Sequence, residues 1–382
     1  MDKINILHTI NNLQVGGSEK FLVNLVNAMD DSRFTNYITY GGDSTLLNEF
    51  KYNIRVIKIY ESTLSFTPKS LYLIPRFVDV IRKYNIDVVH AHLFDSGLLT
   101  SIAAKLNKTP VIYHVPGLLE TQTKKQKIIS RMPIFRKLIN ELYSVYIAGQ
   151  KYSVQELINR WHVPEDKIKI IHHGIDIERF NPCLKDLRDE FNIDPGTPVL
   201  GFVGRLHPEK GIPDMLRIFK EVRKQINSKL IIVGDGEHRT KYEQLAIKFG
   251  IDNDVNFTGF RNDIPEVMKT FDVYFQTTHA PLIGTTVLEA MAVGKPIITL
   301  ARNEEEVKMA METVKPGVNG IIIPPDEKRA AEMICELLRD KDRLEEMGKE
   351  SRKIVEEKFD FRDTVKRLEG LYIELVNSRK RA

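Results

Sequence analysis

The sequence predicts an α/β protein made of two facing, Rossmann-like domains, each a doubly wound parallel sheet. The chain has 382 residues, of which 42% are hydrophobic and 28% charged, enough to build two globular cores. Thirteen short runs rich in β-branched residues alternate with amphipathic stretches of helix length. Several runs carry apolar residues at consecutive positions, as in parallel strands covered on both faces. Thirteen strands are too many for one ordinary open sheet, so two sheets fit better.

The expected strands fall into a set of seven and a set of six. They are 4–10, 36–40, 54–60, 87–92, 110–115, 145–149 and 168–174, then 198–204, 229–234, 255–259, 272–278, 296–301 and 320–325. The segment 181–199 holds three prolines and a glycine and separates the two sets. We therefore expect domains at 1–187 and 188–360. The remaining residues, 361–382, hold a last helix that follows no strand and can pack back on the first domain.

Several classes of protein are excluded by composition and motif. Cys183 and Cys335 are too few for a disulfide framework or a zinc cluster. No apolar run reaches about 18 residues, and residues 1–10 are too short a run for a signal peptide. There is no P-loop, and the G-x-G at 234–236 lacks the third glycine of a dinucleotide fingerprint. The acidic triplet 252–254 is expected to be a turn rather than a metal site. A cytoplasmic protein is expected.

Positive charge is concentrated in the first half of the chain. Residues 1–185 contain 24 Lys and Arg against 17 Asp and Glu, a net of 24 − 17 = +7, whereas the whole chain has a net charge of +4. The densest segment, 123–137, has six basic residues, no acidic residue and five large apolar ones. It is either a solvated surface helix and loop or a patch that contacts an anionic membrane or a lipid phosphate. Nucleic acid is not expected as a partner, because interleaved aromatic residues are lacking.

The segment 198–222 combines a strand end with two cations. The strand ends at Gly204, Arg205 follows, and Lys210 stands just before an amphipathic helix. Ligands of open parallel sheets bind outside the carboxyl ends of the strands. Arg205 and Lys210 are therefore suited to a diphosphate whose developing charge must be neutralised. A salt bridge for Arg205 and a solvated helix start for Lys210 are the structural alternatives.

The segment 277–298 combines a helix start with an acid. After a strand and a loop, Gly284 precedes a helix that begins at Thr285 and Thr286. Free N–H groups at a helix start bind anions. Glu289 lies in a helix that is otherwise apolar on almost every side, and an acid there is seldom buried without a partner. Ribose hydroxyls would provide one, and an internal arginine or a backbone cluster is the alternative.

These two segments resemble the family-4 retaining glycosyltransferases, whose fold is the two-domain GT-B arrangement. The resemblance runs over most of the chain, and the order and spacing of the motifs make it specific. The matching segments are VGG-S-E (15–19), VVHAH (88–92), YHVPG (113–117), IHHGIDIERFNP (171–182), VGRLHPEKG (203–211), VGDGEHR (233–239), VNFTGFRNDIPEVM (255–268), LEAMAVGKP (288–296) and GVNGIIIPP (317–325).

The resemblance implies a donor site on the second domain. Arg205 and Lys210, after Gly204, would bind the diphosphate of a nucleotide sugar, and Glu289 would hold the ribose hydroxyls. The backbone at the helix start would meet phosphate or sugar, and two further residues would border the base. In addition to those already named, the donor-binding residues implied are Gly284, Thr285, Thr286, Phe260 and Arg261. A UDP-sugar is favoured, with no cofactor and no metal, because the cations and a helix dipole take the place of a metal ion.

The resemblance also assigns roles in the first domain. Gly16 and Gly17 would let the backbone close on the donor, and His114 would lie beside the transferred sugar. A core imidazole is the alternative for His114, and His90 and His92 are left undecided between the two interpretations. The acceptor would be a glycan or a lipid-linked glycan in cell-surface polysaccharide synthesis, with peripheral contact to the inner membrane face through 123–137.

One departure from the family pattern bears on activity. The family usually carries another glutamate eight positions before that of Glu289, with seven residues between the two, and here Pro281 stands in its place. That carboxylate usually contacts the donor sugar. A degenerate protein that binds nucleotide sugar without transferring it therefore stays open as an alternative. A second alternative, independent of Pro281, is a nucleotide-sugar epimerase on the same fold.

Overall fold

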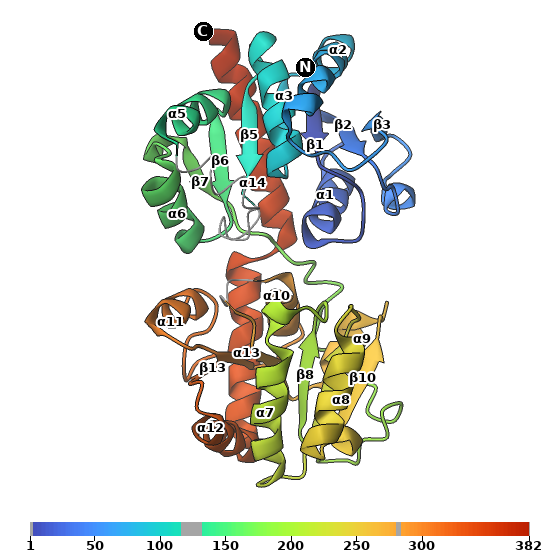
Figure 1. The fold of residues 1–382 in the computed structure, drawn as a ribbon, viewed down its shortest axis with the longest axis vertical. Helices are drawn as coiled ribbons and strands as arrows, with labels where there is room; N and C mark the ends of the chain where they lie inside the picture. The colour runs from blue at the N-terminus through green and yellow to red at the C-terminus, as the bar shows by residue number, and fades with distance from the viewer. Residues whose placement is uncertain (1–2, 116–131, 280–283, 382) are drawn as a thin grey trace. The chain divides into compact units, whose positions relative to one another are not determined.

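A computed structural model describes residues 3–115, 132–279 and 284–381 (Figure 1). The chain divides into two compact units. The first is Met1–His173 together with Arg362–Ala382, and the second is Gly174–Phe361. The domain ranges 1–187, 188–360 and 361–382 stay predictions. Among the described residues no helix is both long and apolar enough to cross a bilayer.

The first unit contains a seven-stranded sheet in the order β3-β2-β1-β4-β5-β6-β7, and all its neighbouring strands are parallel. The strands are β1 (Ile4–Thr9), β2 (Phe34–Gly41), β3 (Arg55–Tyr60), β4 (Val88–Ala91), β5 (Val111–His114), β6 (Val145–Ala148) and β7 (Ile168–Ile170). Each lies within or close to an expected run, although β7 stops well before the expected end at 174.

Helices and short 3₁₀ turns connect the strands of this sheet. They are α1 (Gly17–Ala28), η1 (Leu47–Glu49), η2 (Pro68–Leu73), α2 (Ile74–Lys83), α3 (Phe94–Leu106), α5 (Pro133–Leu142), α6 (Lys151–Trp161) and η4 (Glu165–Lys167). The last helix of the chain, α14 (Phe361–Arg381), belongs with this unit from Arg362 onward. Its Tyr372 is buried, and the Tyr372 hydroxyl lies 2.7 Å from Nδ1 of His90. The expected return of the C-terminal helix to the first domain is thus confirmed.

The second unit contains a six-stranded parallel sheet in the order β10-β9-β8-β11-β12-β13. This is the Rossmann order, and its direction reverses between β8 and β11, where ligands bind in such sheets. The strands are β8 (Val199–Val203), β9 (Lys229–Val233), β10 (Val255–Gly259), β11 (Val273–Gln276), β12 (Ile297–Leu300) and β13 (Gly320–Ile323). All thirteen expected strands are therefore present in the described part of the chain.

The helices of the second unit cover both faces of its sheet. They are η5 (Pro208–Lys210), α7 (Ile212–Arg223), α8 (Arg239–Phe249), η6 (Asp252–Asp254), α9 (Ile264–Thr270), α10 (Thr285–Ala292), α11 (Glu304–Ala310), α12 (Glu327–Arg339) and α13 (Lys341–Lys358). Two separate apolar clusters result, with Leu200 and Phe202 in one and Val199 and Val203 in the other. Consecutive apolar residues along β8 thus alternate between two buried faces, as the sequence predicts.

The packing of α14 gives a stability prediction. Tyr372→Phe removes a buried hydrogen bond and should lower the free energy of unfolding by about 1 kcal/mol, whereas Tyr372→Ala also leaves a cavity and should cost about 3–5 kcal/mol. Urea unfolding followed by circular dichroism measures both. Tyr52→Ala is the matched control, since Tyr52 is fully exposed. Equal midpoints for Tyr372→Ala and wild type would mean that α14 does not pack as described.

Candidate active site

The loops that follow β8 and β9 are held together by backbone contacts. The Gly204 N–H donates to the Val233 carbonyl oxygen over 2.9 Å, and the Leu206 N–H donates to that of Asp235 over 2.9 Å. A side chain at Gly234, where φ is +127°, would strike the carbonyl oxygen of Gly204. The G-x-G at 234–236 therefore serves close backbone packing at the carboxyl edge of the sheet, rather than dinucleotide binding.

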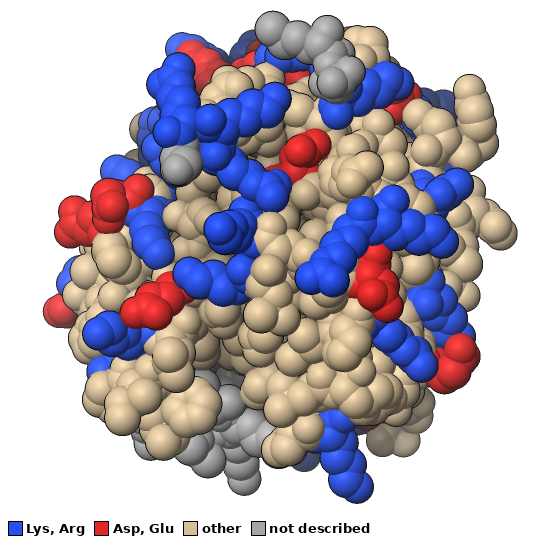
Figure 2. Space-filling view, turned by 90° about the horizontal axis from the view of Figure 1, so that it is seen from above, with Lys and Arg blue, Asp and Glu red and all other residues tan. Residues whose placement is uncertain are grey.

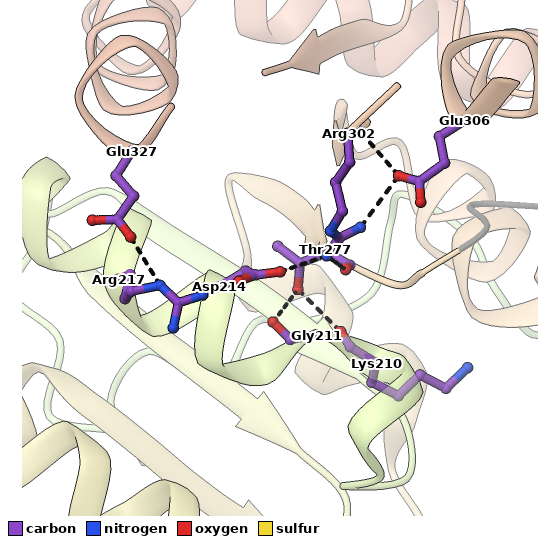
Figure 3. Close-up of polar contacts among 8 residues, drawn as sticks. All are labelled: Lys210, Gly211, Asp214, Arg217, Thr277, Arg302, Glu306 and Glu327. Atoms are coloured by element: carbon purple, nitrogen blue, oxygen red, sulfur yellow. Dashed lines mark hydrogen bonds and ion pairs between the residues drawn. The ribbon is translucent and has the colours of Figure 1, made fainter. Parts of the chain in front are cut away.

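The end of β11 fixes the turn that carries Lys210. The hydroxyl oxygen of Thr277 lies 3.0 Å from the carbonyl oxygens of both Lys210 and Gly211 (Figure 3). The His279 N–H donates to the Glu209 carbonyl oxygen over 2.8 Å. Gly211 has φ +65°, and a Cβ there would collide with the Thr277 carbonyl oxygen. Only glycine suits this position, because the backbone is left-handed and has no room for a side chain.

A network of ion pairs lies next to this turn, and Lys210 is not part of the network. Arg302 donates to the Thr277 carbonyl oxygen over 2.8 Å and to Asp214 Oδ2 over 2.6 Å, and it also pairs with Glu306. Arg217 pairs with Asp214 and with Glu327. In Figure 3 the Lys210 side chain points away from these groups. The network therefore neutralises its own cations and fixes the turn, while the Lys210 ammonium stays available.

Arg205 and Lys210 have no ion-pair partner among the described residues. Arg205 is exposed and Lys210 is half-buried. Burial lowers the pKa of Lys210, and the nearby Arg205 charge adds to that effect against the opposing charge of Glu209. Arg205 therefore forms no salt bridge among the described residues, and Lys210 is not fully solvated. The structure supports neither of the two structural alternatives. Two neighbouring cations that form no ion pair with an acid among the described residues offer a place for an anion.

The start of α10 offers further anion-binding groups. Gly284 is the residue before the helix, and no side chain caps the first turn there. The N–H groups of a first turn have no partner within their helix. The Thr286 hydroxyl is held 2.9 Å from the Tyr274 hydroxyl, which also lies 3.1 Å from the Val203 carbonyl oxygen. Thr285 and Thr286 thus present backbone N–H groups, while Thr286 is anchored to the ends of β8 and β11.

Glu289 carries a carboxylate without a hydrogen-bond or ion-pair partner in the described part of the chain. Burial raises the pKa of Glu289 to about 7, and the charge of Arg179 opposes this rise only in part. The alternative of an internal arginine partner is thus met only in part, because the Arg179 charge is nearby but forms no direct contact with Glu289. A half-buried carboxylate with unfilled acceptor positions costs stability, unless a ligand supplies hydroxyl donors.

The two residues expected to border the base differ in their environment. The Phe260 side chain is 70% exposed, which leaves its ring free for stacking. Arg261 pairs with Glu190 and Asp263, and its Nε lies 2.8 Å from Asp263 Oδ1. Arg261 therefore supports the loop through internal ion pairs. The triplet 252–254 forms η6, where Asp254 pairs with Arg223 and Lys229, as expected for a structural turn.

In the first unit, His114 lies at the end of β5 and is buried. Its Nε2 lies 2.9 Å from Nε2 of His173, and its Nδ1 has no partner among the described residues. Burial lowers the pKa of both imidazoles, for His173 to about 4, so both are neutral near pH 7. The His173 ring stacks on Phe21 at 4.5 Å between centroids. The Nδ1 atom of His114 is thus buried without a partner among the described residues, while its Nε2 atom is held by His173.

The remaining histidines of this unit form a buried cluster. Nδ1 of His8 lies 3.0 Å from Nε2 of His92, and Nε2 of His8 lies 3.1 Å from the Asn36 side-chain oxygen. His90 contacts Tyr372, as described above. Burial lowers the pKa of His8 to about 4 and that of His90 and His92 well below the usual value. This neutral packing favours the core interpretation for His90 and His92.

Sequence reasoning missed the partners that position the site. The roles of Thr277, Arg302 and Phe21 depend on contacts between residues far apart in the chain, which no local pattern announces. Gly16 immediately precedes α1 and Gly17 opens it, and a side chain at Gly17 would meet no atom within 4 Å. Pro281 and residues 123–131 of the basic segment lie outside the described residues.

Two family models match successive parts of the chain. "Glycosyltransferase Family 4" matches residues 15–179, and "Glycosyl transferases group 1" matches residues 185–354. The chain belongs to the family-4 glycosyltransferases. The segments matched by these models include every expected site residue of both units.

Three similar proteins support the assignment of this glycosyltransferase. The UDP-Gal:alpha-D-GlcNAc-diphosphoundecaprenol alpha-1,3-galactosyltransferase of Escherichia coli is 27% identical over 94% of this chain and 90% of its own. The capsular polysaccharide biosynthesis glycosyltransferase CapM of Staphylococcus aureus is 28% identical, covering 75% of this chain and 76% of its own. The crystal structure of Anabaena Alr3699/HepE in complex with UDP has a TM-score of 0.81 at 23% identity, covering 98% and 100% of the two chains. The last likeness shows the GT-B fold.

Glu289 gives a pH-dependent prediction. Because its folded pKa is raised from 4.5 to about 7, the folded protein holds this proton more tightly than the unfolded chain. The contribution of the group to stability is present at acidic pH and is lost as the pH rises through this window. Glu289→Gln should therefore leave the free energy of unfolding nearly unchanged at pH 5 and raise it by up to about 3 kcal/mol at pH 8.

Urea unfolding at the two pH values measures this difference. Glu336→Gln, at an exposed position of α12, is the control and should change the free energy of unfolding by less than about 0.5 kcal/mol at either pH. An equal effect of Glu289→Gln at both pH values would contradict a half-buried, unpartnered carboxylate.

Proposed function

We propose that this glycosyltransferase moves a hexose or N-acetylhexosamine from a UDP-sugar to a glycan or lipid-linked acceptor in cell-surface polysaccharide synthesis. The observation that carries the proposal is the set of unpaired groups at the carboxyl edge of the second sheet. Arg205, Lys210 and the start of α10 supply positive charge and N–H donors for a diphosphate. Glu289 supplies a carboxylate for ribose hydroxyls. A nucleoside diphosphate matches all of these groups at once.

The choice of donor and acceptor is supported by the similar proteins. The name of the E. coli relative gives UDP-galactose as donor and a diphosphoundecaprenol-linked sugar as acceptor, and HepE was crystallised with UDP. CapM is named for capsular polysaccharide biosynthesis. The exposed ring of Phe260 suits a base at the end of the same site.

We propose transfer with retention and without a metal ion. The bond between the anomeric carbon and the β-phosphate oxygen breaks, and the acceptor hydroxyl oxygen bonds to the same face of that carbon. The proton of this hydroxyl passes to the departing phosphate. Arg205 and Lys210 stabilise the charge that develops on this phosphate, as preorganised donors do in other transferases. His114, with its free Nδ1, would lie beside the transferred sugar, and Gly16 and Gly17 would approach the donor.

A peripheral membrane contact at the inner face would bring the enzyme to a lipid-linked acceptor. In support, α5 exposes Ile134, Phe135 and Leu138, and the last two line a cavity of about 300 Å³. Basic residues also end two helices of this unit, Arg82 and Lys83 in α2 and 379–381 in α14. Figure 2, the view from above, shows Lys and Arg side chains gathered on this face with acidic side chains scattered among them.

Pro281 is the feature that keeps a non-transferring binder as an alternative, and the shared fold keeps an epimerase as another. An epimerase converts donor without acceptor, so incubating a UDP-sugar by itself and looking for epimerised sugar separates it from a transferase. A binding protein gives neither product, and Pro281→Glu should then raise activity by restoring the family's carboxylate.

Lys210 provides the test of the phosphate site. Lys210→Ala should lower kcat by about 100-fold or more, because a donor to transition-state charge is lost, while the thermal midpoint stays near that of wild type. UDP release from a panel of UDP-sugars with a lipid-linked acceptor measures kcat. Lys241→Ala, at an exposed position of α8, is the control and should keep full activity. A folded Lys210→Ala protein with wild-type kcat would refute the proposed phosphate site.

A further inference from the structure

The second unit contains a cavity of about 740 Å³ that none of the proposed donor residues lines. It lies at the amino ends of three strands, where Pro198 precedes β8, Asp272 precedes β11 and Pro296 precedes β12. The donor residues follow the carboxyl ends of the same parallel strands. The two sites are therefore on opposite edges of one sheet, about 17 Å apart along the five residues of β8.

The lining of this cavity carries an excess of positive charge. Seven lining residues are Lys or Arg and three are Asp or Glu. Each acid is paired with a lining cation: Asp272 with Arg188, Glu345 with Lys349, and Glu356 with Arg352. Four lysines have no acidic partner among the described residues: Lys269, Lys295, Lys341 and Lys353. The cavity thus gathers four uncompensated cations.

Lys295 is the most constrained of these lysines. It stands between Gly294, whose φ is +77°, and Pro296 at the start of β12. Its ammonium donates to the Lys269 carbonyl oxygen over 2.8 Å, which uses one of three N–H donors. Burial and the neighbouring charge of Lys269 lower the pKa of Lys295 to about 8. A largely buried lysine is normally paired with an acid, and this one faces a cavity instead.

The walls of the cavity are fixed by contacts of other residues than the four lysines. Nη1 of Arg352 donates to the carbonyl oxygens of Ile177, Phe180 and Ala292 over 3.1, 2.6 and 2.8 Å. Arg352 therefore ties α13 to the segment 177–180 and to the last residue of α10. Gly348 packs so closely that a Cβ would strike the Gly294 carbonyl oxygen. The cavity is preformed, and its volume is within the range of small-molecule sites.

We propose that this cavity is a second ligand site, which binds a small soluble molecule carrying a diphosphate. Lysine ammonium groups bind phosphate as point charges, and four of them balance the charge of two phosphate groups. A small ligand is favoured because the cavity volume, about 740 Å³, is of the size that small-molecule sites have.

Inorganic pyrophosphate in isothermal titration calorimetry is the first probe of this site. The double variant Arg205→Ala/Lys210→Ala removes the cations of the donor site, so the remaining binding reports on the cavity alone. In that background pyrophosphate should bind in a ratio of one to one. Adding Lys295→Gln and Lys353→Gln should weaken the affinity by about tenfold or more, since each lost charge-assisted bond contributes substantially. Adding Lys248→Gln, at an exposed position of α8, is the control and should leave the affinity unchanged.

Three results would overturn the proposal. They are the absence of pyrophosphate binding in the donor-site variant, equal affinity with and without the two lysines in folded protein, and equal affinity for inorganic sulfate, which would indicate unspecific anion binding. Thermal unfolding checks that each variant is folded. Lys341→Gln, at an exposed position, is a second cavity variant in case Lys295→Gln does not fold. This test is independent of the proposed function, because Lys295→Gln in the otherwise wild-type protein should keep its sugar-transfer rate.

Discussion

The candidate donor site depends on how closely the turn at Gly211 packs against the end of β11. The Thr277 carbonyl oxygen occupies the space that a side chain at Gly211 would need, and the Thr277 hydroxyl approaches the carbonyl oxygens on both sides of that residue. Arg302 donates to the same Thr277 carbonyl and joins it to Asp214 on α7. Strand, turn and helix are thus fixed together. The position of Lys210 follows from this contact, because it is the last residue before the glycine.

At the carboxyl edge of the second sheet, some charged side chains form ion pairs and others do not. Arg302, Arg217 and Arg261 all have acidic partners, and they stabilise loops. In the described part of the chain, Arg205 and Lys210 have no acidic partner. Glu289 has no basic partner in direct contact, and its pKa is raised. Unpaired charges cost folding energy, and proteins retain them where ligands bind. The four lysines at the opposite edge of the sheet follow the same rule, which is why we assign them a ligand.

Much of the fold could be predicted from sequence, because its strands are short, apolar and separated by helices. Consecutive apolar residues in 198–204 and 229–234 indicate strands buried on both faces, and β8 and β9 are such strands. The return of α14 followed from a helix without a strand before it. The end of β7 was not predictable, because the apolar pattern continues to Ile171 after the pairing with β6 has ended at Ile170.

Candidate donor residues could be proposed from local sequence signals, and their roles stay predictions. Glycines and cations after a strand are local signals, and so is a lone acid in an apolar helix. The pairing of His114 with His173, the contact of Thr277 with Gly211 and the lysine-lined cavity join residues that are distant in sequence. Residue spacing and periodicity cannot predict such contacts, because they depend on how distant parts of the chain pack together.

The affinity of UDP and of its 2′-deoxy analogue for wild type and Glu289→Gln tests the central claim most directly. If the Glu289 carboxylate holds the ribose hydroxyls, calorimetry at pH 8 should give a wild-type protein that binds UDP about tenfold or more tightly than the deoxy analogue, a difference of about 1.4 kcal/mol. The variant should bind the two ligands nearly equally. The same preference for UDP in wild type and variant would contradict the account, and so would the absence of UDP binding by folded wild-type protein.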